Sequence, residues 1–396
     1  MSKITDRTQM YFKSLLLSIV CLSVITISYS QQVLSPVYSN VYYAGNNNVN
    51  QSMDIYIPPG LTSPAPVIVY IHGGGWSSGS KGPVNVPFFQ QSFYSGFICA
   101  DINYRLSGDS IWPAQIEDCK TAIRFLKANS ALYNIDTCNF GVMGESAGGH
   151  LASMVGTSAG VKALEGFHQG SRNQTSRVKA VVDLYGPTDF LKEDGYYPSS
   201  CGTNGLIHNY SSFETNLLGV DYLHTHPELV STANPITYIT PDDARFFIIH
   251  GAEDCVVPPY QSTLLNSALS SANIPADDFI IAAGQGHSTA YFRATERTTL
   301  YNSFFLTHLL TPCVTTVNSA AIIKKISVFP NPAKDEITID IDVTGNLSVE
   351  LVNTNGITVI RSQNQKILNI AGLSPGIYFI KLITSDGTYI QKIIKQ

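Results

Sequence analysis

Ser146 stands at the centre of the segment Gly144-Glu145-Ser146-Ala147-Gly148, between an apolar run at residues 140–143 and a stretch compatible with a helix. A serine on such a strand-to-helix turn exposes its hydroxyl, and the flanking glycines let the strand and the helix pass closely. The G-x-S-x-G pattern also recurs by chance, so it indicates a nucleophile only together with further residues.

Three consecutive glycines lie between His72 and Trp76, directly after the apolar run at residues 67–71. A glycine run leaves backbone N–H groups able to converge on one point with no side chain in the way. Such donors stabilise the negative oxygen that forms when a hydroxyl attacks a carbonyl, and the residue after the nucleophile, Ala147, offers another. The run therefore predicts an oxyanion-binding loop.

A serine hydroxyl needs a base, and the base needs a carboxylate to orient it. In the fold that carries this motif the chain order is serine, acid, histidine. Glu253 and Asp254 follow the apolar run at residues 246–249, and we favour Asp254 as the acid. His287 lies next to glycine in a loop and is the predicted base, whereas His308 lies in an apolar helical pattern.

The elements that position these residues follow from the pattern of residues 60–310, where short apolar runs alternate with helical stretches. Strands that are apolar on both faces and separated by helices indicate a buried, mostly parallel sheet of the α/β class, flanked by helices. The predicted strands are residues 67–71, 97–102, 140–143, 178–184, 246–249 and 279–282, and the clearest helices are residues 114–129 and 261–271.

The helical pattern stops before residue 324, and residues 324–396 are typical of a small all-β sandwich domain. Residues 336–341 alternate between polar and apolar, and Asn355-Gly356 and Asp386-Gly387 are typical of hairpin turns. The predicted organisation is a signal peptide at 1–30, an α/β domain at 31–310, a linker at 311–323 and the β domain at 324–396.

The apolar run at residues 15–27 follows basic residues and is too short for a membrane span, which needs about 20 residues. It suits a signal peptide cleaved before Gln31, with an uncleaved anchor as the alternative, and no later segment is apolar enough to span a bilayer. Export is therefore expected. With 24 basic and 29 acidic residues, the chain has no basic field to attract nucleic acid.

Six cysteines remain after the signal peptide, and an exported chain permits disulfides among them. The pairing we favour joins Cys201, in an insert at residues 191–218, to Cys255 beside the predicted acid. No CxxC or Cys/His ligand spacing occurs, so no metal site is predicted.

The insert at residues 191–218 is polar and aromatic. We interpret it as part of the substrate cleft, where Tyr196 and Tyr197 could stack on sugar or phenolic rings; an ordinary surface loop is the alternative. Trp76 is expected either to line the entrance to the pocket or to be buried against the sheet.

The segments at residues 72–76, 101–106, 113–119, 144–150, 186–190 and 233–236 together resemble the α/β-hydrolase esterases. They are most similar to the bacterial feruloyl-esterase/acetylxylan-esterase-like group, related to hormone-sensitive-lipase-type carboxylesterases. The resemblance covers roughly residues 50–310. It implies Ser146 as nucleophile, Asp254 as acid and His287 as base, with oxyanion-hole donors from the backbone of Gly74, Gly75 and Ala147.

Residues 328–333, 373–378 and 392–395 resemble the C-terminal sorting domain of type IX secretion. That resemblance implies a Gram-negative host, passage through the periplasm, and release outside or attachment at the cell surface. The domain would serve as an address for the secretion machinery and take no part in catalysis.

The expected function is that of a secreted serine esterase that deacylates plant cell-wall polysaccharide without a cofactor. Its substrate would be an acylated polysaccharide or oligosaccharide. A general small-ester carboxylesterase or a peptidase would use the same triad, and a non-catalytic carbohydrate-binding protein with a relict triad is the other alternative. Turnover of a chromogenic acetate would separate the enzymes from the binding protein.

A base that must be unprotonated predicts a loss of activity in acid. Because histidine in peptides titrates near pH 6.5, we expect kcat/KM to fall as the pH drops through about 6. The measurement is a pH profile on a chromogenic ester. A rate that stays flat from pH 5 to 8 would count against His287 as the base.

Overall fold

The computed structural model describes residues 34–202, 208, 210–310, 327–341, 347–354, 357–384 and 387–396. The predicted signal peptide at 1–30, the predicted linker at 311–323, the pair Asn355-Gly356 and Asp386 lie outside the described residues. Among the helices that are described, none combines the length and the apolar character needed to cross a bilayer.

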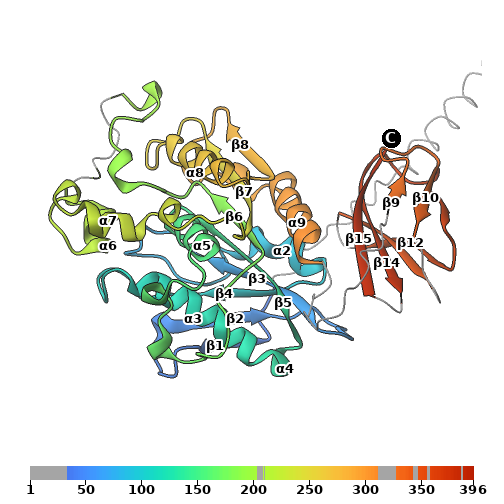
Figure 1. Ribbon diagram of the computed structural model, residues 1–396, viewed down its shortest axis with the longest axis horizontal. Coiled ribbons are helices and arrows are strands. Elements are labelled where there is room, and N and C mark those ends of the chain that lie inside the picture. Colours follow the sequence, from blue (N-terminus) through green and yellow to red (C-terminus); the bar gives the residue numbers. More distant parts are fainter. Residues whose placement is uncertain are drawn as a thin grey trace, which may run out of the picture. The chain divides into compact units, whose positions relative to one another are not determined.

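An eight-stranded sheet in the order β1-β2-β4-β3-β5-β6-β7-β8 lies at the centre of the first domain (Figure 1). Strand β2 pairs antiparallel with β1 and β4, and the remaining pairs are parallel, which confirms the predicted α/β class. Each of the six predicted strands is present. The strands are β1 (Tyr38–Tyr42), β2 (Ser52–Tyr56), β3 (Ala65–Ile71), β4 (Ile98–Ile102), β5 (Ile135–Glu145), β6 (Ala180–Leu184), β7 (Arg245–Gly251) and β8 (Asp278–Ala282).

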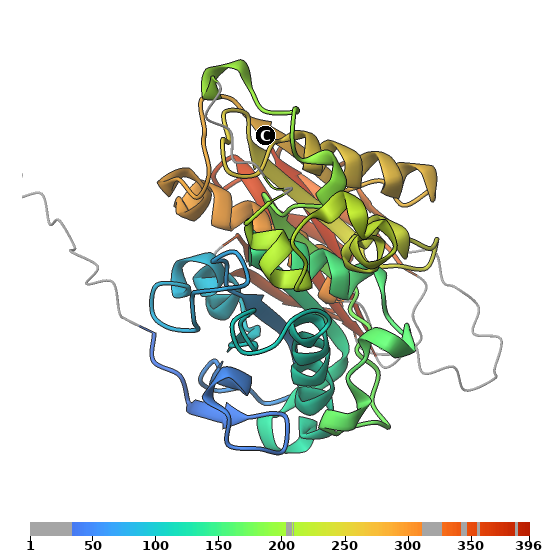
Figure 2. The same cartoon turned by 90° about the vertical axis from the view of Figure 1, so that its left-hand side faces the viewer.

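Helices cover both faces of this sheet (Figure 2). Helices α3 and α5 pack against each other, as do α2 and α9, and strands β2, β4 and β6 are buried along their whole length. Strands β4 and β6 therefore carry apolar residues on both faces of the sheet. The helices are α2 (Val86–Tyr94), α3 (Ala114–Ala128), α4 (Ser130–Tyr133), α5 (Ala147–Thr157), α6 (Phe213–Leu218), α7 (Pro227–Ala233), α8 (Tyr260–Ser271) and α9 (Thr295–Leu309).

The C-terminal domain contains a three-stranded sheet, β13-β10-β9, and a four-stranded sheet, β12-β11-β14-β15. Side chains from both sheets share one core, which confirms the predicted all-β domain. In β10 the predicted alternation holds, because Ile337 and Ile339 are buried while Glu336 and Asp340 are exposed. The strands are β9 (Ser327–Phe329), β10 (Glu336–Asp340), β11 (Ser348–Asn353), β12 (Thr358–Gln363), β13 (Ile367–Asn369), β14 (Gly376–Thr384) and β15 (Gly387–Lys395).

The residues selected for chemistry all follow the carboxyl ends of parallel strands. The glycine loop follows β3, Ser146 follows β5, Asp254 follows β7 and His287 follows β8. Because the carboxyl ends of parallel strands meet at one edge of the sheet, these four segments share the edge where ligands bind in α/β folds.

Helix α5 approaches strand β3 so closely that the contact requires glycine. A Cβ atom on Gly148 would lie 2.1 Å from the carbonyl oxygen of Ile71, which is backbone and has no alternative rotamer. We expect Gly148→Ala to cost about 1–3 kcal/mol, and hence to lower Tm by several degrees at about 2–4 °C per kcal/mol.

Thermal unfolding followed by circular dichroism checks this, with Gly108→Ala as the matched control. Gly108 has open space around the corresponding Cβ position and needs no positive φ. Equal Tm values for the two variants would contradict the close contact.

Candidate active site

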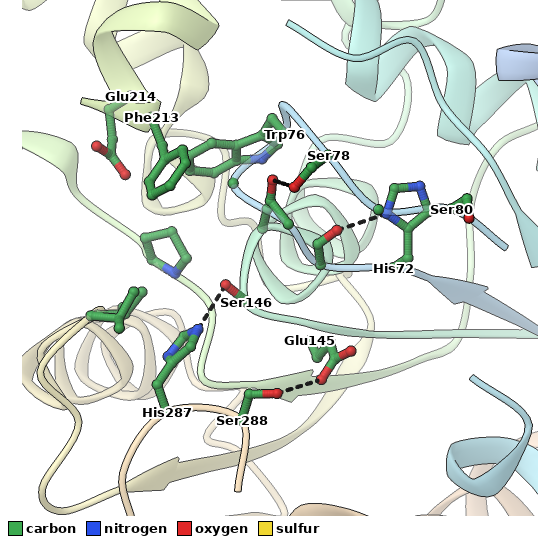
Figure 3. Close-up of a pocket in the computed structure, with 18 of the residues that line it drawn as sticks. His72, Trp76, Ser78, Ser80, Glu145, Ser146, Phe213, Glu214, His287 and Ser288 are labelled. Atoms are coloured by element: carbon green, nitrogen blue, oxygen red, sulfur yellow. Dashed lines mark hydrogen bonds between the residues drawn. The ribbon is translucent and has the colours of Figure 1, made fainter. Parts of the chain in front are cut away.

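Ser146 occupies the turn between β5 and α5 with a backbone φ of 55°, a strained conformation for a residue with a side chain. Its N–H donates to the carbonyl oxygen of Leu184 at 2.9 Å, and its own carbonyl accepts from the N–H of His150 at 3.0 Å. The turn presents the hydroxyl to a cavity, where Oγ lies 3.0 Å from Nε2 of His287 (Figure 3).

His287 connects this hydroxyl to a buried carboxylate. Its Nδ1 lies 2.7 Å from Oδ2 of Asp254, and a proton on Nδ1 leaves Nε2 able to accept from the serine. Asp254 is fully buried, and its other oxygen accepts from the N–H groups of Val256 at 2.8 Å and Val257 at 3.0 Å.

Asp254 is held in its charged form by the groups around it. Burial opposes ionisation, but hydrogen bonds from His250 and His287 outweigh it and hold the pKa of Asp254 well below its usual range. Nε2 of His250 lies 3.3 Å from Oδ2 of Asp254 and 2.9 Å from the carbonyl oxygen of Val257. Sequence reasoning did not select His250, although it directly follows the apolar run that leads to Asp254.

Gly74, Gly75 and Ala147 line the same cavity as Ser146. Among the backbone hydrogen bonds of the described residues, none uses the N–H groups of these three residues, so all three can donate to a bound oxygen. Gly75 has a φ of 59°, and a Cβ atom there would lie 2.4 Å from the ring of Phe213. Only glycine fits where this loop meets α6.

Trp76 connects the glycine loop to helix α5, which follows Ser146. Its Nε1–H donates to Nδ1 of His150 at 3.2 Å, and Nε2 of His150 lies 2.6 Å from the carbonyl oxygen of Ala233. Burial lowers the pKa of His150 to about 4, so this ring is neutral near pH 7. Trp76 is 1% exposed, packs against the rings of His150 and Phe190, and contributes to the cavity lining.

A cavity of about 540 Å³ extends from Ser146 and His287. Within the described residues no lysine or arginine lines it, and its polar groups are mostly serines, histidines and two glutamates. Its apolar lining comes from side chains that include Val84, Pro187, Phe213, Val256 and Val257.

Tyr196 and Tyr197 are not among the residues that line this cavity, unlike the expectation for them. Tyr196 stacks on Tyr260 with ring centroids 4.1 Å apart, and the hydroxyl of Tyr197 donates to the carbonyl oxygen of Val256 at 3.2 Å. The aromatic composition of the insert did not specify which way the rings point. Tyr196 is 48% exposed, whereas Tyr197 contacts two residues of the cavity lining, His208 and Val256.

Cys201 and Cys255 form a disulfide, the pair favoured from the sequence. Since Cys255 directly follows Asp254, this bond ties the insert to the loop that carries the buried carboxylate. Cys138 is also disulfide-bonded, whereas Cys99 and Cys119 are buried free thiols.

The fold and the site define an α/β-hydrolase in which a serine, a histidine and an aspartate form one chain of hydrogen bonds at the carboxyl edge of the sheet. The chain belongs to the BD-FAE family, whose profile matches residues 53–269. Residues 327–396 match the secretion system C-terminal sorting domain.

Individual relatives agree with this assignment. Esterase LipC of Mycobacterium tuberculosis is 30% identical over 227 residues, 57% of this chain and 53% of that protein. The chain spans about half the length of the curated relatives it matches. Among solved structures, a truncated carbohydrate esterase from gut microbiota is 31% identical with a TM-score of 0.63, over 70% of this chain and 98% of that one. A bifunctional GH43-CE of Bacteroides eggerthii is 33% identical with a TM-score of 0.63, and the match covers 68% of this chain and 35% of that one.

The geometry distinguishes Asp254 from its neighbour Glu253. We expect Asp254→Asn to lower kcat by about 10³–10⁴-fold, because the amide favours the wrong tautomer of His287 and no longer stabilises its charged form. The matched control is Glu253→Gln, which should keep activity close to that of the wild type. Steady-state kinetics on a chromogenic ester measures both, and an equal loss in both variants would contradict the assignment.

Proposed function

We propose that this protein is an exported serine esterase that removes acetyl or feruloyl groups from plant cell-wall polysaccharide. The observation that carries the proposal is the hydrogen-bonded series Asp254–His287–Ser146. It ends in a cavity beside glycine N–H groups that donate to no backbone carbonyl in the described part of the chain. This arrangement is suited to acyl transfer to a serine hydroxyl.

In the proposed reaction, Oγ of Ser146 attacks the ester carbonyl carbon while Nε2 of His287 takes the hydroxyl proton. The negative oxygen of the tetrahedral intermediate accepts hydrogen bonds from the N–H groups of the glycine loop and of Ala147. Collapse of the intermediate expels the sugar oxygen, which receives the proton from His287. A water molecule, deprotonated by the same nitrogen, then releases the carboxylic acid and restores Ser146.

The cavity supports a neutral acyl group as the bound part of the substrate. Its size, about 540 Å³, lies within the range of small-molecule sites, and its walls include the apolar side chains of Phe213, Pro187 and Val257. A charged substrate group would lack a basic partner, because no lysine or arginine lines the cavity in the described part of the chain.

A carbohydrate substrate is supported by the titles of the two solved structures at 31% and 33% identity, which name carbohydrate esterase modules. The sorting-domain match supports delivery by the type IX machinery to the cell surface or beyond it, where polymeric substrates are found. We assign the catalytic part to residues 31–310 and the sorting part to residues 324–396, joined by a linker at 311–323.

The test compares release of acetate from acetylated xylan and of ferulate from methyl ferulate, for the wild type and Ser146→Ala. We expect the wild type to release at least one acid and Ser146→Ala to lose at least 10³-fold in kcat, since the remaining groups cannot supply a nucleophile. Ser267→Ala, an exposed serine on α8, is the control and should behave as the wild type.

The outcomes separate the alternatives. Cleavage of only a small chromogenic ester through Ser146 would keep the mechanism and remove the polysaccharide substrate, leaving a general carboxylesterase. Amide cleavage through Ser146 would indicate a peptidase. No Ser146-dependent turnover of any of these substrates would contradict the esterase and favour a carbohydrate-binding protein.

A further inference from the structure

Three buried side chains of the insert and of α6 point their ligating atoms at one another. Nδ1 of His208 lies 3.1 Å from Oε2 of Glu193 and 2.8 Å from Oε2 of Glu214. The exposed fractions of Glu193, His208 and Glu214 are 0%, 2% and 2%, and one ligating atom from each lies within 4.8 Å of the others. We call these three residues the Glu–His–Glu cluster.

The cluster is short of hydrogen-bond partners. Within the described residues, neither carboxylate oxygen of Glu193 has one, and Nδ1 of His208 and Oε2 of Glu214 also have none despite their short separations. Burying carboxylate oxygens without donors is costly, and such groups in proteins are normally paired or bound to a metal ion. The ring nitrogen of His208 and the two carboxylates therefore converge as a set of buried atoms of the kind that ligate a metal ion.

The tautomer of His208 follows from its other nitrogen. The Tyr197 hydroxyl lies 2.5 Å from Nε2 of His208 and donates its own proton to the carbonyl oxygen of Val256. With the hydroxyl proton donated to Val256, Nε2 donates to the tyrosine oxygen, and the neutral ring then offers the lone pair of Nδ1 as a metal ligand. Metal-binding histidines typically have their second nitrogen oriented by a hydrogen bond in this way.

We propose that Glu193, His208 and Glu214 bind one divalent cation of the zinc class. Around a tetrahedral zinc ion, with bonds of about 2.0–2.2 Å, neighbouring ligand atoms lie about 3.3–3.6 Å apart, so the two carboxylates, 2.8 and 3.1 Å from Nδ1 here, would move outward by about half an ångström or less on binding. One imidazole and two carboxylates suit zinc better than calcium, which takes six to eight oxygen ligands. The two carboxylates also balance the charge of the cation.

The cation would fix one wall of the cavity. His208 and Glu214 line the cavity with Ser146, and Glu214 lies next to Phe213 on its wall (Figure 3). Glu193 comes from the start of the insert, directly after the 3₁₀ turn Phe190–Lys192, whereas Glu214 lies in the first turn of α6. The fourth coordination position would face the cavity. The proposed zinc site does not depend on the proposed esterase function.

The experiment uses the full chain, stripped with a chelator and titrated with zinc chloride by calorimetry, with bound zinc counted by elemental analysis after desalting. We expect one zinc per chain in the wild type and a rise in Tm on loading, because a ligand that binds only the folded state stabilises it. Glu193→Gln, which removes a charge and keeps the shape, should weaken binding at least tenfold.

The matched control is Glu228→Gln, an exposed glutamate on α7 that should bind zinc as the wild type does. The exposed pair His224 and His226 remains in both variants, so zinc held there would survive Glu193→Gln and overturn the proposal. No zinc retained by the wild type would also overturn it and leave a shared proton between the carboxylates and His208.

X-ray absorption on zinc-loaded wild type provides a second measurement that does not depend on the folding of a variant. It should show nitrogen and oxygen ligands at about 2.0–2.2 Å with a single imidazole. Two or more imidazoles, or a sulfur ligand, would contradict the Glu–His–Glu cluster as the site.

Discussion

The turn at Ser146 holds a residue with a side chain at a φ of 55°, and the arrangement of the site depends on keeping it there. Strain of this kind costs on the order of 1–3 kcal/mol and persists only where the surrounding structure enforces it. Here the enforcement comes from the hydrogen bond to Leu184 and from the contact of α5 with the backbone of β3. Strand β3 also leads into the glycine loop, so one contact positions Ser146 and that loop together.

A hydrogen bond between Trp76 and His150 also holds the glycine loop against α5. The indole N–H of Trp76 donates to His150 in the first turn of α5. The other ring nitrogen of His150 lies within hydrogen-bond distance of the carbonyl oxygen of Ala233 at the end of α7. Because His150 is buried and neutral near pH 7, the link does not change with protonation in that range. Electrostatic preorganisation of an oxyanion site requires donors that do not move during the reaction, and this packing provides that rigidity.

The sequence predicted those parts of the fold and site that depend on local patterns. The six apolar runs, the serine between glycines and the glycine loop are each readable from a few neighbouring residues. Strand β1 was not predicted, because its side chains are largely exposed and only pairing with β2 gives it a place. The contact of Trp76 with His150 and that of His250 with Asp254 join segments whose proximity arises only on folding or in a loop conformation that no pattern specifies.

The insert at residues 191–218 is the part of the site whose contacts the sequence predicted least. The Glu–His–Glu cluster has no motif spacing in the sequence. The sequence therefore did not predict that Glu193, His208 and Glu214 lie together. Ordering a segment without regular secondary structure costs much conformational entropy, and cross-links reduce that cost. The disulfide from Cys201 to Cys255 supplies one cross-link, and the hydrogen bond from Tyr197 to Val256 a second. Both end beside Asp254, so the insert and the carboxylate that contacts His287 are fixed at the same place. In the proposed esterase, a change in the insert that alters which acyl group fits would therefore also shift Asp254 and, through it, His287.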